Sequence, residues 1–130
     1  MQEINKKAKM ATITELENIS TQVRRDIIRM VNAVSSGHPG GSLGCADVMT
    51  ALYFEAMSLD TENFKRDGKG EDMFFLSNGH ISPVLYSVLA RRGYFPVSEL
   101  ATFRKLGTRL QGHPSVHDNL PGVRQASGSL

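Results

Sequence analysis

A stripe of apolar residues between positions 14 and 34 is the feature that most constrains how this chain can fold. Apolar residues recur there every three or four positions, which predicts one amphipathic helix of about five turns. Thr14 and Glu17 have the spacing of a capping box at its start. We expect Ser36-Gly37 to end the helix, because glycine permits a left-handed cap and Pro39 prevents the helix from resuming. The stripe consists of Leu16, Ile19, Val23, Ile27, Met30, Val31 and Val34.

The remainder of the chain predicts further helices and one strand. Met73-Phe74-Phe75-Leu76 is a short apolar run bounded by polar turns, which indicates a buried strand. Ser82 is a candidate N-cap with Pro83 at the first helical position. A strand that leads through a glycine turn into a helix favours an α/β fold, although one strand is little for a complete sheet. Residues 1–13 form a polar lead-in to a domain over 14–130, whose other predicted parts are a glycine-rich loop over 37–44, helices over 46–57, 82–93 and 98–106, a charged connector over 60–72, and mostly loop over 107–130.

Composition argues against several classes of protein. The 130 residues carry 15 basic and 13 acidic side chains, mixed along the chain, with no basic run interleaved with aromatics that would indicate nucleic-acid binding. No apolar run reaches the ~18 residues of a membrane span. The charged N-terminus has no apolar stretch behind it, so it is not a secretory signal. The lone Cys45 forms no internal disulfide and fits a reducing compartment, so we expect a cytoplasmic protein.

Three of the four histidines share a local setting. His38 lies in Ser-Gly-His-Pro-Gly, His80 in Ser-Asn-Gly-His and His113 in Gln-Gly-His-Pro. Glycine lets the backbone approach a ligand closely, and proline stiffens a turn. Such loops present an imidazole from a fixed position, which proton transfer requires. The alternative for each is a solvated turn whose histidine has no role in chemistry.

Two other kinds of site are open at this stage. The backbone N–H groups at the helix start near Ser82 would attract a phosphate, and His80 lies at that mouth; an ordinary strand-to-helix turn explains the same residues. His113 and His117 have a spacing acceptable for zinc. Against zinc, Pro114 lies between them and Cys45 is the only thiol. The glycine-rich loop lacks the Lys-Ser/Thr ending of a P-loop.

In series, these motifs resemble the signatures of transketolases. The resemblance covers about residues 14–130, and the order and spacing of the motifs agree throughout. It rests on Ser36-Gly37-His38-Pro39-Gly40 with Leu43-Gly44, on Leu76-Ser77-Asn78-Gly79-His80, on Phe103-Arg104 with Gly112-His113-Pro114 and Leu120-Pro121-Gly122-Val123, and on Ser127-Gly128-Ser129-Leu130.

The resemblance implies a thiamine diphosphate-dependent transfer of a two-carbon unit from a ketose phosphate to an aldose phosphate. By resemblance, His38 and His113 would contact the substrate hydroxyls and the reacting centre, and His80 would lie close to the cofactor and donor. Gly128 and Leu130 would lie along thiamine diphosphate, with Gly128 near its diphosphate. The implied fold is the N-terminal helices and first strands of a mainly parallel, incomplete cofactor-binding fold.

The sequence departs from the family pattern at its end. The Gly-Asp-Gly motif and later Asn that hold Mg²⁺ or Ca²⁺ in the family do not occur. We therefore expect no metal ligand within this chain and no activity from it alone. Its expected partners are sugar phosphates and the remaining transketolase domains or the second subunit of a two-subunit transketolase, which form a homo-oligomer in the complete enzyme. A bare sheet edge should then invite association. The alternative is a non-catalytic binding or assembly module that keeps these helices.

Overall fold

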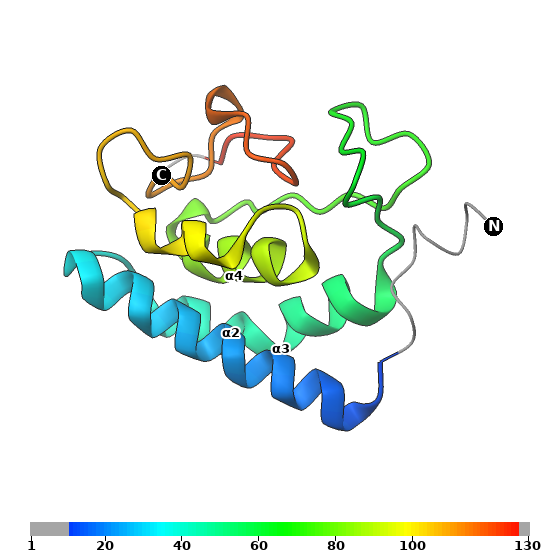
Figure 1. Ribbon diagram of the computed structural model, residues 1–130, viewed down its shortest axis with the longest axis horizontal. Helices are drawn as coiled ribbons and strands as arrows, with labels where there is room; N and C mark the ends of the chain where they lie inside the picture. Colours follow the sequence, from blue (N-terminus) through cyan, green and yellow to red (C-terminus); the bar gives the residue numbers. More distant parts are fainter. Residues whose placement is uncertain (1–10, 128–130) are drawn as a thin grey trace.

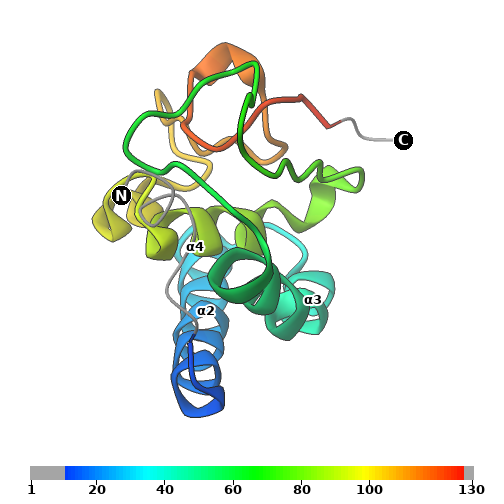
Figure 2. The same ribbon diagram turned by 90° about the vertical axis from the view of Figure 1, so that its right-hand side faces the viewer.

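Three helices lie side by side on one side of the molecule, and long connectors cover the other (Figure 1). The computed structural model describes residues 11–127. Figure 2 shows α2 and α3 next to each other with α4 against both. None of the helices in this range is long and apolar enough to cross a membrane. The elements are α2 (Ile13–Val34), α3 (Pro39–Ala51), the π-helical turn η1 (Leu52–Ala56), η2 (Gly79–Ile81), α4 (Ser82–Arg92), η3 (Val97–Thr102) and η4 (Val116–Asp118).

The long first helix, α2, is confirmed, but its caps differ from those predicted. The capping box is formed by Thr12 and Glu15, not by Thr14 and Glu17: the Glu15 N–H donates to Thr12 Oγ1, and the Thr12 N–H donates to the Glu15 carboxylate, each at 3.1 Å. The helix ends at Val34, and its C-cap is Ser35, not the predicted Ser36-Gly37; Ser35 takes a left-handed φ of 48°. One face of α2 is buried as the periodicity predicts; it includes Val23, Ile27 and Met30.

The prediction of a glycine-rich loop over 37–44 is largely wrong, because α3 begins at Pro39 and includes the glycines after it. Glycine disfavours a helix by about 1 kcal/mol per residue, which is why the sequence pattern indicates a loop. In this chain, close packing between α3 and η2 outweighs the low helix propensity of glycine. A Cβ on Gly41 would lie 2.6 Å from Ile81 Cγ2, so only glycine lets the first turn of α3 approach η2 this closely.

The shortest of the three helices, α4, is the centre of the molecule. All residues from 82 to 90 are buried, because α2 and α3 cover one side of it and the connectors the other. Gly93 ends it in a left-handed conformation, as predicted. Ser82 is not the N-cap: it is the first helical residue, after Ile81. The Ser42 hydroxyl of α3 accepts from the Val84 N–H at 3.3 Å, and so serves one of the N–H groups that a helix start leaves free.

The strand expected at Met73-Phe74-Phe75-Leu76 is not formed. The segment is not helical, but no strand occurs between residues 11 and 127, so nothing in that range supplies the ladder of hydrogen bonds that a strand needs. Its side chains still alternate as in a strand. Phe74 and Leu76 are partly buried, whereas Met73 and Phe75 are 47% and 50% exposed. The helical part of the predicted α/β fold is therefore confirmed and its sheet is not. The helix expected over 98–106 is the shorter turn η3.

Candidate functional site

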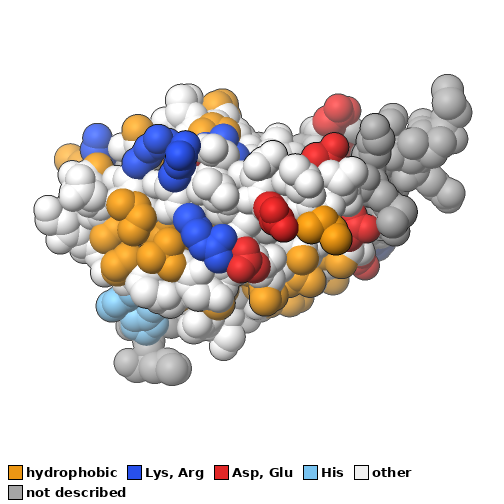
Figure 3. Space-filling model, turned by 90° about the horizontal axis from the view of Figure 1, so that it is seen from below, with side chains coloured by type: hydrophobic (Ala, Val, Ile, Leu, Met, Phe, Trp, Pro, Cys, Tyr) orange, Lys and Arg blue, Asp and Glu red, His pale blue; other side chains and the backbone are white. Residues whose placement is uncertain are grey.

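The structure brings His38, His80 and His113 into one row. The ring centroids of His38 and His80 are 5.1 Å apart, and those of His80 and His113 are 4.8 Å apart. Both pairs meet edge to face, so His80 is the middle member. His38 is exposed and the other two are partly buried. Figure 3 shows histidine side chains at one corner of the face that it views. The row thus runs from an exposed histidine, His38, to the partly buried His80 and His113.

The packing of α3 on η2 places the first two histidines. His38 is the residue immediately before α3, and Pro39 occupies the first helical position and fixes the turn. His80 is the central residue of η2, which leads directly into α4. Because Gly41 lets α3 lie against Ile81, the histidines that precede α3 and α4 come within ring contact.

Two side chains of α4 hold the loop that carries His113. The Ser82 hydroxyl donates to the Gly112 carbonyl at 2.7 Å. One turn later, the Tyr86 hydroxyl donates to the Gln111 carbonyl at 2.6 Å. These two bonds fix the residues just before His113 against the helix whose start follows His80. The serine expected to cap α4 instead aligns this third histidine.

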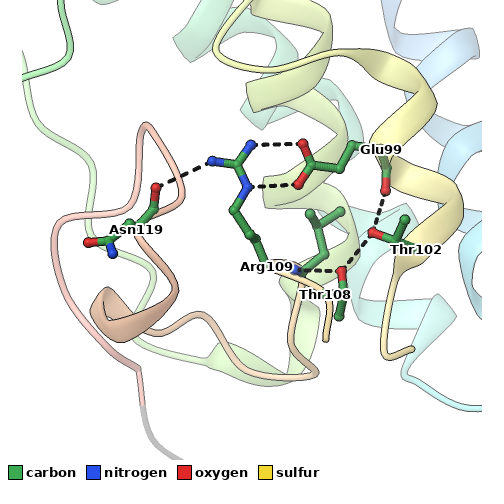
Figure 4. A network of polar contacts seen from close by, with 6 residues as sticks. Glu99, Thr102, Thr108, Arg109 and Asn119 are labelled. Carbon is green, nitrogen blue, oxygen red and sulfur yellow. Dashed lines mark hydrogen bonds and ion pairs between the residues drawn. The ribbon is translucent and has the colours of Figure 1, made fainter. Parts of the chain in front are cut away.

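The approach to His113 from η3 is fixed by a second network, shown in Figure 4. Arg109 donates through Nε and Nη2 to the Glu99 carboxylate at 2.9 and 2.8 Å. The hydroxyls of Thr102 and Thr108 share a hydrogen bond of 2.6 Å, and Thr108 Oγ1 also accepts from the Leu110 N–H at 3.0 Å. The loop between η3 and the histidine is therefore anchored at several points, and bidentate Arg–carboxylate pairs are the more specific kind.

Two buried polar atoms beside the row have no hydrogen-bond partner within residues 11–127. They are His113 Nε2 and Ser127 Oγ. Both side chains lie close to Gly79: a Cβ there would lie 2.6 Å from Ser127 Oγ and 2.9 Å from His113 Cδ2. Buried polar groups are normally satisfied, so such a pair beside three imidazoles fits a site for a polar ligand. Sequence reasoning missed Ser127, because nothing local marks a serine as buried.

His113 is held towards its neutral form. Burial lowers its pKa from the ordinary value of 6.5, and the neighbouring His80, Arg104 and His38 lower it further. A desolvated imidazole among other basic groups is harder to protonate. No ion pair between described residues involves a histidine. The imidazole at the enclosed end is therefore uncharged near pH 7.

The other candidate residues do not join the row. His117 is exposed in η4, and no ring contact within residues 11–127 includes it. That range also holds no group of three or more His, Cys, Asp or Glu side chains arranged to bind a metal ion. Gly128 and Leu130, expected along the cofactor, lie outside the described residues.

Comparison with known proteins gives the same family as the motifs. The family described as "Transketolase, thiamine diphosphate binding domain" matches residues 16–130. The 6-deoxy-6-sulfo-D-fructose transketolase subunit of Clostridium sp. (strain MSTE9) is 36% identical over 117 residues, which are 89% of this chain and 41% of that protein. The transketolase of Mus musculus is 36% identical over 118 residues, which cover 88% of this chain and 18% of that protein.

A solved structure has the same fold. Transketolase from Leishmania mexicana superposes with a TM-score of 0.81 at 32% identity, over 94% of this chain and 18% of that chain. The chain thus spans less than half the length of each of these relatives. The chain therefore belongs to the transketolase family, within its thiamine diphosphate-binding domain.

Proposed function

We propose that this chain supplies part of a transketolase, which transfers a two-carbon ketol unit from a ketose phosphate to an aldose phosphate, as in the pentose phosphate pathway. The observation that carries the proposal is the contact row of His38, His80 and His113 in a chain of this family. We further propose that the chain is inactive alone and acts in the cytoplasm with the remaining domains or a second subunit, as a homo-oligomer.

The row suits the proton transfers of this reaction. His113 is neutral and its buried Nε2 has no partner in the described part of the chain, so it is free to exchange a hydrogen bond or a proton with a sugar hydroxyl. His38 lies at the exposed end, where a substrate can reach it. His80 lies between them, which suits a position next to both cofactor and donor. Thiamine diphosphate, when bound, supplies the electron sink for breaking the carbon–carbon bond.

The residues present also suit the cofactor itself. Ser127 Oγ and His113 Nε2 are two buried polar atoms without a partner among residues 11–127, and both side chains lie close to Gly79. Gly128 and Leu130 would continue along the cofactor, with Gly128 near the diphosphate. Its Mg²⁺ or Ca²⁺ would be held by residues that this sequence does not contain. The Clostridium relative is named for a sulfonated ketose, so we propose a ketose with an anionic group as the substrate class.

Recovery of the tagged chain from its own cells tests this proposal. The captured material is assayed for ketol transfer between a ketose phosphate and an aldose phosphate, with thiamine diphosphate and Mg²⁺ added. We expect activity in the captured complex and none in the purified chain. His113→Ala should lower kcat by about 10²- to 10⁴-fold, the usual contribution of general acid–base catalysis. His117→Ala is the matched control and should leave kcat unchanged.

Three outcomes would contradict the proposal. Turnover by the purified chain would show that it needs no partner. Equal activity of the His113→Ala and His117→Ala complexes would remove the histidine row from the chemistry. A captured complex with unrelated partners and no ketol transfer would favour a non-catalytic assembly module.

A further inference from the structure

Arg104 has an unusual backbone for its residue type. Its φ is +60°, a left-handed value, and only Ser35 and Asn119 share a positive φ among the described non-glycine residues. Those two end helical turns, where left-handed residues are common. Arg104 likewise follows a helical turn, one residue beyond the cap of η3. Its N–H donates to the Leu110 carbonyl at 2.9 Å, which closes the loop over 104–110 and fixes the direction of its side chain.

The Arg104 guanidinium bridges two of the loops that carry histidines. Its Nη1 donates to Ser36 Oγ at 3.0 Å, two residues before His38. A Cβ on Gly112 would lie 2.7 Å from Arg104 Cζ and Nη2, so the guanidinium rests on the backbone just before His113. A side chain at position 112 would displace it. The contacts therefore tie the end of α2 to the third histidine loop.

The charge of Arg104 has no carboxylate partner within the described range. The ion pairs there involve Arg24, Arg91, Arg109 and Arg124. The groups that act on His113 are all basic: Arg104 and the imidazoles of His80 and His38, with no acidic residue among them. Burial of His113 and this uncompensated cation both disfavour a second positive charge.

We propose that Arg104 is a positioning residue of the histidine row: it clamps the His113 loop to the end of α2 and sets a fixed positive charge beside the imidazoles. It acts through its contacts with Ser36 and with the backbone at Gly112. Its effect is to keep the His113 imidazole neutral over a wider range of pH. That a neutral His113 serves catalysis rests on the proposed function. The influence of Arg104 on the protonation of His113 does not.

NMR titration of the histidine ring protons in the full 130-residue chain tests this role without cofactor or partner. Arg104→Gln should raise the midpoint of His113 by about 0.5 pH units, the size expected when one nearby charge is removed in a solvent-like dielectric. Arg104→Lys keeps the charge and should retain most of the depression. Arg25→Gln removes an exposed arginine of α2 and should leave the midpoint unchanged.

An Arg104→Gln midpoint equal to that of the unsubstituted chain would overturn the proposal, as would an equal rise in Arg25→Gln. If Arg104→Gln does not fold, the salt dependence of the His113 midpoint in the unsubstituted chain still tests the proposal. Added salt screens exposed charges, so the His113 midpoint should rise between low and high NaCl, and a constant midpoint would overturn the proposal. A negative result in these titrations does not change the outcome expected in the ketol-transfer assay, so the two proposals can be rejected separately.

Discussion

At the scale of residues, the missing side chain of Gly79 lets Ser127 and His113 pack closely against the backbone beside His80. A Cβ at this position would meet Ser127 Oγ at 2.6 Å and the Ser127 carbonyl at 3.0 Å. We expect Gly79→Ala to lower the free energy of unfolding by about 1–3 kcal/mol, the usual cost of overpacking. A Cβ on Gly44 of α3 would meet nothing within 4 Å, so Gly44→Ala should raise the free energy of unfolding by about 0.5–1 kcal/mol. Urea unfolding of both variants checks this; equal changes would contradict it.

The three histidines could be singled out from the sequence, but the contacts that hold them in place could not. Glycine and proline beside His38, His80 and His113 indicate stiff loops, because these residue types act on the local backbone. The contact row arises from contacts between distant positions, such as Gly41 with Ile81 and the hydrogen bond from Ser82 to Gly112, which are 30 residues apart. The left-handed Arg104 likewise depends on its bond to Leu110. No local pattern in a single sequence encodes such pairings.

At the scale of elements, a regular period was a good guide and a biased composition was not. The period of about 3.6 residues predicts α2 because its apolar face is buried. It fails for the start of α3, where glycine gives no apolar stripe and close contact with Ile81 decides the conformation. The run Met73-Phe74-Phe75-Leu76 has the alternation of a strand. A strand, however, is a property of two segments, and the described residues contain only one of them.

Two ion pairs join α2 to its neighbours, and their burial predicts different contributions to stability. Asp26 of α2 is 3% exposed and accepts from Arg91 of α4 at 2.8 Å through both carboxylate oxygens, and from Ser87. Arg24 pairs with Asp47 of α3 at 2.8 Å, but these side chains are 41% and 73% exposed. We expect Asp26→Asn to cost about 2–3 kcal/mol, somewhat below the loss of a fully buried pair, because Arg91 retains some solvent contact.

The exposed pair is the control for this difference. Arg24→Met should cost at most about 1 kcal/mol, since surface pairs contribute little. The double substitution Asp26→Leu with Arg91→Met should recover much of the loss, because two apolar side chains leave no buried charge unpaired. Thermal and urea unfolding measure all three. A loss for Arg24→Met as large as that for Asp26→Asn would show that burial does not set these energies.

At the scale of the whole molecule, the helices bury a core while the segment over 73–76 keeps one face bare. Phe74 contacts Tyr53 at a centroid distance of 6.0 Å, which holds the inner face of the segment on the helices. Met73 and Phe75 face outwards, and no backbone hydrogen bond of residues 73–76 is formed within the range 11–127. Exposed apolar side chains on an unpaired extended backbone are a template for edge-to-edge association. The isolated chain should therefore self-associate through this segment.

Sedimentation velocity over a concentration series measures that association. The double variant Met73→Ser with Phe75→Ser should shift the chain towards monomer, because it removes the apolar face that makes pairing favourable. Leu106→Ser is the matched control: Leu106 is fully exposed but lies at a turn beyond η3, not on an extended segment. It should leave the distribution unchanged. A chain that stays monomeric at every concentration and melts in one sharp transition would show that the bare face is already satisfied. If the two variants reduced association equally, exposed apolar area in general would be its cause. The segment over 73–76 differs from Leu106 in that its backbone can pair with another chain.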